Sequence, residues 1–275
     1  TQADLDAIIA GNNNEAAGTA AYVAPEENTS IELGMKGLFL DGTLQLFAAL
    51  FTTEYTDLQV TSNVVTNTGA DLLRKTNAGK ATINGLELEA RWLVIENGEL
   101  SGSMSVLDAT YDDFLTTDSK YGRDGLAFNP SAGNPALPNL LDFSGNHLVM
   151  APEFSASVNY EHFVGLESGA TLKPRVRVGY TSEVWFDPAN RGDRPAGFKN
   201  LPYAADIDRQ DAYTKVDLSL TFEPSEGSWS TEAFVNNVTD RDIKSDQGRT
   251  HGDAVPNFMW QSPRTFGVRF NVSFE

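Results

Sequence analysis

Carboxylates are so abundant in this chain of 275 residues, with 38 Asp and Glu side chains, that no acid–base pair stands out among them. Its three histidines, His147, His162 and His251, are far apart, whereas a helical metal motif places two of them about four residues apart. The absence of cysteine excludes thiolate metal ligands, disulfides and cysteine nucleophiles. The sequence also lacks the nucleophile elbow, the phosphate loop and the dinucleotide fingerprint. We therefore predict no catalytic residue, no metal site and no cofactor, and we expect that the chain is not an enzyme.

Three shorter signals have simple alternative explanations. The aspartates of DATYDDF at 108–114 could chelate a hard cation such as calcium, but solvated acids at the rim of a structure explain them better. Arg-Gly-Asp at 191–193 spells an adhesion tripeptide, which a loop of an acidic chain produces by chance. The sequence at 237–239 fits a glycosylation sequon but falls in a predicted strand.

The overall charge restricts the possible partners. The formal net charge is −18 and the isoelectric point is near 4.5, so we expect no binding to nucleic acid. The hydrophobic fraction of 40% is sufficient for a folded core. No apolar run approaches the roughly 18 residues that a membrane helix requires.

The charged residues lie in segments where apolar and polar side chains alternate, which is the period of a β-strand. In PRTFGVRFNVSFE, for example, Phe266, Val268, Phe270, Val272 and Phe274 alternate with small or polar residues. We expect about nine such strands, each of roughly 12–18 residues, with one apolar and one polar face. The usual strand has about 5–6 residues.

The connections between these strands alternate between short and long. Short links are expected near 38–42, 96–98, 164–169 and 224–227. Long loops rich in Gly, Pro, Asn and Asp are expected at about 61–76, 117–144, 187–208 and 241–258, and 1–28 is expected to be a truncated extracellular loop. This alternation favours an all-β antiparallel meander.

Aromatic residues cluster near the strand ends. Those near short links include Trp92, Tyr160, Phe222 and Trp229. Aromatic belts beside an aliphatic band are typical of a large transmembrane β-barrel, in which closure satisfies every strand edge. Because barrels of one bacterial chain have an even number of strands, we expect further strands before Thr1. A soluble antiparallel sheet also alternates and remains an alternative.

The alternation also places a set of charged side chains on the polar face. An Arg or Lys at the midplane of the lipid face would cost about 2–4 kcal/mol, so we expect these charges to face the lumen. The predicted lumen residues are Glu32, Lys36, Glu87, Glu89, Arg91, Arg175, Arg177, Asp217 and Arg269.

Over most of its length the chain resembles the C-terminal barrel part of the TonB-dependent outer-membrane receptors. The motifs that carry the resemblance are APEENTSIELGMKG, NAGKATINGLELEARW, FVNNVTDRDI and PRTFGVRFNVSF, in the family's order. The chain departs from the family pattern in Val238, where Leu is usual, and in Glu275, which follows the last aromatic. The resemblance implies a barrel of about 22 strands that is filled by a plug domain, and residues 1–275 would form a part of that barrel without the plug or its TonB box.

The resemblance also implies partners and a function. Phe266, Val268, Phe270, Val272 and Phe274 would form the assembly signal that the barrel-assembly machinery reads. The TonB–ExbB–ExbD complex would act through the plug, and the barrel would face outer-membrane lipid. The expected function is active uptake of a scarce ligand such as a metal chelate, most often a ferric siderophore. A passive porin and a soluble all-β binding module are the alternatives.

Overall fold

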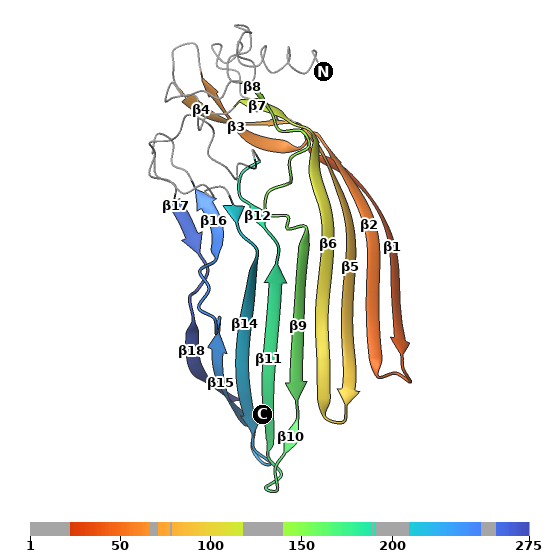
Figure 1. Cartoon of the computed structure of the whole chain (residues 1–275), viewed down its shortest axis with the longest axis vertical. Helices are drawn as coiled ribbons and strands as arrows, with labels where there is room; N and C mark the ends of the chain where they lie inside the picture. Colours follow the sequence, from red (N-terminus) through yellow and green to blue (C-terminus); the bar gives the residue numbers. More distant parts are fainter. Residues whose placement is uncertain are drawn as a thin grey trace.

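The computed structural model describes residues 23–65, 71–77, 79–117, 140–188, 190, 209–248 and 257–274. Nine strands form one continuous antiparallel path, which confirms the predicted all-β meander. They are β1 (Glu27–Phe39), β2 (Leu44–Thr56), β5 (Lys80–Ile95), β6 (Gly98–Asp113), β9 (Phe154–His162), β11 (Thr171–Thr181), β14 (Tyr213–Glu223), β15 (Trp229–Asn236) and β18 (Thr265–Val272). Each strand pairs with its neighbour in this order (Figure 1).

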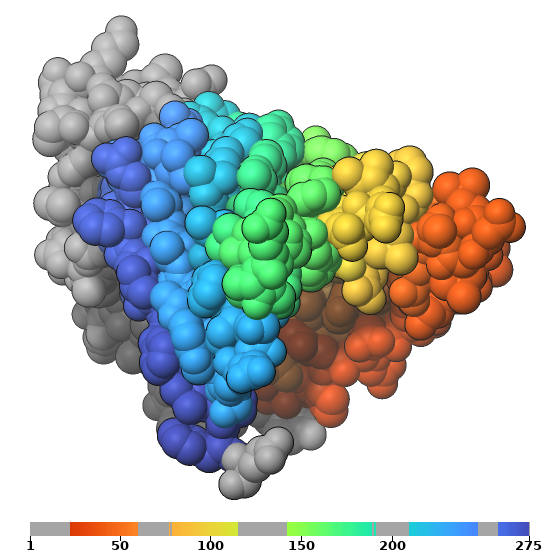
Figure 2. All heavy atoms as spheres, turned by 90° about the horizontal axis from the view of Figure 1, so that it is seen from below, coloured from red at the N-terminus to blue at the C-terminus, as the bar shows by residue number. Residues whose placement is uncertain are grey.

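The sheet is curved. Seen from the edge that carries the short turns, the strands follow one another in sequence order around an arc (Figure 2). In the described part of the chain, β1 and β18 form the two ends of this arc. No helix among the described residues has the length and apolar character needed to cross a membrane.

The short connections all lie at one edge of the sheet, the lower edge in Figure 1. Leu40, Asp41 and Gly42 have positive φ in the first turn, and Asn97 has a φ of 61° in the second. Asn, Asp and Gly tolerate this left-handed conformation better than other residues. The turn residues therefore fix the tight hairpins that the sequence predicted at this edge.

The other edge contains more structure than we expected. Four pairs of short strands lie there: β3 (Gln59–Val65) with β4 (Asp71–Asn77), β7 (Leu115–Thr117) with β8 (Leu140–Asp142), β12 (Val184–Trp185) with β13 (Arg209–Gln210), and β16 (Lys244–Gly248) with β17 (Asn257–Trp260). The prediction of irregular loops throughout 61–76 and 241–258 was therefore wrong. Pairing these short strands satisfies the backbone N–H and C=O groups of the segments that extend beyond the main sheet.

Two other expectations are corrected. β1 begins at Glu27, inside the segment 1–28 that we expected to be a loop. Strand lengths on the main path range from 8 residues in β15 to 16 in β5, so the predicted lower bound of 12 was too long. The ladders of β9 and β15 end early because extra residues interrupt them. Residues 149–153 interrupt the pairing with β6 before β9 begins, and residues 237–243 interrupt the pairing with the β18 side after β15 ends.

A compact aromatic cluster packs against the end of the sheet, at the edge with the long connections. Tyr111 and Phe114 are buried, with ring centroids 4.8 Å apart, and Phe143 packs edge-on against Phe114 at 5.6 Å. The backbone of the 143–148 segment continues the sheet, since Leu148 donates a hydrogen bond to Ala109. Aromatic burial of this kind holds the connection against the end of β6.

Candidate functional site: the charged face of the sheet

The ladder register places the predicted charged residues on one face. Cross-strand partners share a face of a sheet, and Arg91 is connected in this way through Ser101 and Asn159 to Arg177 and Asp217. Side chains two positions apart on a strand also share a face. The pairing registers of β1, β2, β15 and β18 therefore place the remaining predicted residues on the same face as Arg91. All nine predicted residues lie on this face, which we call the charged face: Glu32, Lys36, Glu87, Glu89, Arg91, Arg175, Arg177, Asp217 and Arg269.

The acidic part of the charged face lies on β5. Glu87 and Glu89 are exposed and occupy successive positions on this face. Their partners on β6 are Ser105 and Ser103, whereas Arg91 forms an ion pair of 2.8 Å with Glu99. Two neighbouring carboxylates without a counter-ion among the described residues leave this part of the face open to a cationic partner.

The basic part of the face lies on β11 and β14, three strands away. Arg175 and Arg177 are exposed, and the Nε atom of Arg175 donates a hydrogen bond of 2.6 Å to Asn159. Lys215 occupies the same face beside Gly179. Short hydroxyl side chains separate the acidic part from the basic part, and Ser103 and Ser157 hydrogen-bond each other at 2.9 Å. The two parts differ in charge, although Arg175 is paired with Glu161 and Arg177 with Asp217 across the ladder.

Among the phenylalanines on the charged face, two lie opposite glycines, and the alternation pattern did not predict this arrangement. Phe51 is the cross-strand partner of Gly85, and Phe234 is the partner of Gly267. Each ring covers the surface that its glycine leaves open, an arrangement that recovers packing lost at a strand glycine. The guanidinium of Arg269 also lies 5.4 Å from the Phe234 ring centroid. The sequence signal that could have identified Phe51 and Phe234 is an aromatic residue opposite a glycine on the neighbouring strand.

The opposite face of the sheet is apolar, and we call it the apolar face. One unbroken line of cross-strand partners runs along it over all nine strands: Phe39, Leu44, Trp92, Leu100, Tyr160, Val176, Leu218, Val235 and Phe266. The predicted terminal residues up to Val272 alternate onto this face. Many of these side chains are exposed, Phe266 at 82% and Val268 at 71%. Such a continuous exposed apolar surface requires a non-aqueous neighbour or a binding partner.

The predicted belt residues also lie on the apolar face, near the short turns. The ring centroids of Phe222 and Trp229 are 5.8 Å apart, and those of Trp229 and Phe270 are 5.5 Å apart. Toward the other edge the same face becomes polar at Thr52, Asn84 and Asp108, which are partners on adjacent strands. Along the strands, the apolar face therefore ends in aromatic rings near the short turns and in polar side chains toward the long connections.

Of the aspartates at 108–114, Asp108 belongs to this polar boundary, and Asp112 and Asp113 follow it along the chain. Asp108 and Asp112 are exposed, and Asp112 accepts a hydrogen bond of 2.6 Å from Thr82. Within the described ranges, no three His, Cys, Asp or Glu residues are arranged to hold a metal ion. The Arg-Gly-Asp segment at 191–193 and His251 lie outside the described residues.

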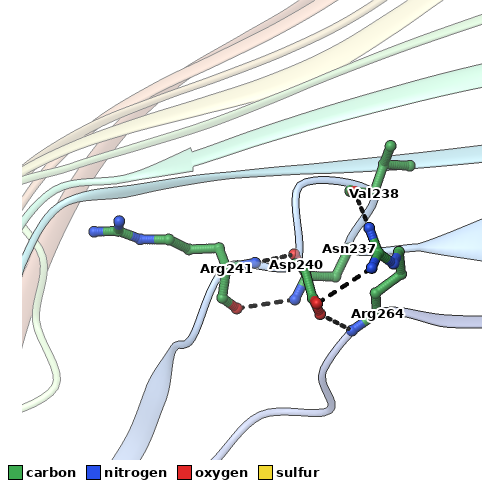
Figure 3. A network of polar contacts seen from close by, with 5 residues as sticks. All are labelled: Asn237, Val238, Asp240, Arg241 and Arg264. Carbon is green, nitrogen blue, oxygen red and sulfur yellow. Dashed lines mark hydrogen bonds and ion pairs between the residues drawn. The ribbon is translucent and has the colours of Figure 1, made fainter.

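A polar network follows β15, where the sequence suggested only a sequon within a strand (Figure 3). β15 ends at Asn236, and Asn237 forms a turn with a φ of 51° and an exposure of 1%. Its side-chain amide accepts a hydrogen bond from the backbone N–H of Arg241 at 3.0 Å and donates one to the Arg241 carbonyl at 2.9 Å. The Asp240 carboxylate accepts a bond of 2.8 Å from the N–H of Arg264. Burial argues against glycosylation of Asn237.

Comparison with known proteins identifies the architecture. Residues 3–238 match the family model described as TonB-dependent receptor-like β-barrel. The chain is 25% identical over 249 residues to the pesticin receptor of Yersinia pestis, covering 90% of this chain and 29% of the receptor. It is 25% identical over 219 residues to a probable TonB-dependent siderophore receptor, PiuA, of Acinetobacter baumannii, covering 78% of this chain and 25% of that protein.

Solved structures agree with the fold. The ferric yersiniabactin uptake receptor FyuA from Yersinia pestis superposes with a TM-score of 0.64 at 21% identity, over 91% of this chain and 30% of that one. The chain thus spans less than a third of the length of these relatives. The curved sheet corresponds to part of the wall of a large outer-membrane β-barrel, as predicted.

Proposed function

Because the chain belongs to the TonB-dependent receptor-like β-barrel family, we propose that it forms the C-terminal part of the barrel of an active outer-membrane importer. The observation that carries this proposal is the separation of the two faces: a continuous apolar line over nine strands, with many exposed side chains, on one side and nine predicted charges on the other. Lipid on the apolar face and a filled, hydrated lumen on the charged face account for both.

The proposed role of the charged face is to contact the plug. A partner that fills the lumen would meet carboxylates at β5 and guanidinium groups at β11. Charge complementarity of this kind fixes the position of a partner and excludes wrong arrangements. The plug would in turn receive energy from TonB–ExbB–ExbD.

The proposed ligand is a metal chelate, most often a ferric siderophore. The names of the relatives support this class: one solved neighbour is a ferric yersiniabactin uptake receptor and another is a ferric citrate transporter. The family relation also supports the prediction that the chain has no catalytic role. The terminal segment, from Phe266 to Phe274, would serve as the signal for the barrel-assembly machinery.

The test uses the complete receptor in an outer membrane. Uptake of radioactive ferric siderophores is measured in cells with and without the energy-transducing complex. Uptake that requires the complex supports the importer, whereas equal uptake in both strains indicates a passive channel and contradicts the proposal.

The role of the charged face is tested separately. The change Arg175→Glu with Arg177→Glu is expected to weaken the hold on the plug and to increase entry of large antibiotics. The same substitution at Arg241, an exposed arginine in the turn after β15, is the control. Unchanged permeability in the double variant would contradict plug contact at β11.

A further inference from the structure

The apolar pattern of β18 does not define a single pairing with β15. A shift of one residue would exchange the two faces of the strand. A shift of two residues keeps every apolar side chain on the apolar face, because Phe266, Val268, Phe270 and Val272 repeat the same alternation. Something besides hydrophobicity must therefore distinguish the observed register from those two residues away.

Two contacts on the charged face make this distinction. In the observed register Glu232 is opposite Arg269 and forms an ion pair with it, while Phe234 is opposite Gly267. A Cβ added at Gly267 would lie 2.9 Å from the Phe234 ring, so this position accepts only a glycine without adjustment. A two-residue shift in either direction removes both contacts, since it places Arg269 or Thr265 opposite Phe234.

A third contact lies just before β18 begins. Arg264 donates its backbone N–H to the Asp240 carboxylate at 2.8 Å, and its guanidinium approaches the same carboxylate at 3.4 Å (Figure 3). Asp240 is itself held by the turn, because its N–H donates to the Asn237 carbonyl at 2.9 Å. We call Asn237, Asp240 and Arg264 the turn clamp. A two-residue shift of β18 would move Arg264 by about 7 Å and break it.

The structure leads us to propose that the turn clamp and the two charged-face contacts fix the register of β18 against β15. These groups are positioning residues, and they set the depth of the terminal aromatics in the membrane. In the observed register Phe270 lies 5.5 Å from Trp229, between ring centroids, near the short-turn edge. This proposal does not depend on what the receptor transports.

Cysteine cross-linking in the complete receptor tests the proposal, and residues 1–275 contain no native cysteine. Thr231 is paired with Phe270 in the observed register, so Thr231→Cys with Phe270→Cys reports this register. Thr231→Cys with Val268→Cys or Val272→Cys reports the two shifted registers. The three reporters are compared in the parent protein, in Asp240→Ala, in Arg269→Ala and in the double variant Asp240→Ala/Arg269→Ala.

The ratio of shifted to native cross-links is expected to rise about threefold in each single variant and about tenfold in the double variant, as for two independent contacts. Arg175→Ala, on β11, is the control and should leave the ratio unchanged. Native cross-links alone in an assembled double variant would overturn the proposal. If the double variant does not reach the membrane, the single variants decide, and an unchanged ratio in both contradicts it.

Discussion

The ring of Phe51 on β2 lies directly over Gly85 on β5, and a Cβ added at Gly85 would be 2.2 Å from the ring Cζ atom. The glycine is buried although it belongs to the charged face. A phenylalanine can therefore lie on a polar face of the wall because the neighbouring strand leaves room for its ring. The same relation between Phe234 and Gly267 occurs at the other end of the sheet.

The first prediction concerns this contact. Gly85→Ala should lower the free energy of unfolding of the complete receptor by about 1–3 kcal/mol, because the new methyl group overlaps the ring. Thermal unfolding in detergent, followed by mobility on gels, measures the change. Gly179→Ala is the control, since it lies on the same face with nothing within 4 Å of the added Cβ. Equal stability of the two variants would show that the Phe51 ring moves freely.

The second prediction tests the assignment of the two faces. Leu218 and Ser219 are neighbours on β14 and lie on opposite faces. Leu218→Arg should cost about 2–4 kcal/mol, because it places a charge in lipid, whereas Ser219→Arg should be tolerated. Refolding into lipid vesicles at graded denaturant concentrations gives both values. A larger penalty at Ser219 would mean that the faces are reversed.

The third prediction concerns the surroundings of the same strand. Spin labels at Val216, Leu218 and Leu220 should be relaxed by oxygen, which partitions into acyl chains, and labels at Asp217 and Ser219 by a water-soluble reagent. This pattern follows if hydrocarbon lies on the apolar face. Labels at the three apolar positions that report water would exclude the membrane interpretation.

The number of strands on the main path and the two faces of each strand could be predicted from the sequence, because both depend on local alternation. The period of two assigned Glu87, Glu89 and Arg91 to one face correctly, and the ladder then joined them to Arg177 and Asp217. No long-range information was needed for this part of the fold, since a strand's two faces follow from its backbone geometry.

Strand ends and the terminal turn could not be predicted in the same way. β15 ends at Asn236, and the side chain of Asn237 holds the extra residues that follow by hydrogen bonds to the backbone of Arg241. These hydrogen bonds depend on the positions of Arg241 and Asp240 in three dimensions, which the alternation pattern does not predict.

The last prediction concerns Asn237 itself. Asn237→Gly removes the amide but tolerates the positive φ of 51°, so it isolates the contribution of the two hydrogen bonds to Arg241. Loss of these buried bonds should lower the free energy of unfolding by about 1–3 kcal/mol. The adjacent Asn236→Ala is the control, since Asn236 is exposed and should change stability by less than about 0.5 kcal/mol. If both variants unfold at the parent temperature in detergent, the buried amide contributes nothing to stability, and water replaces it at no cost.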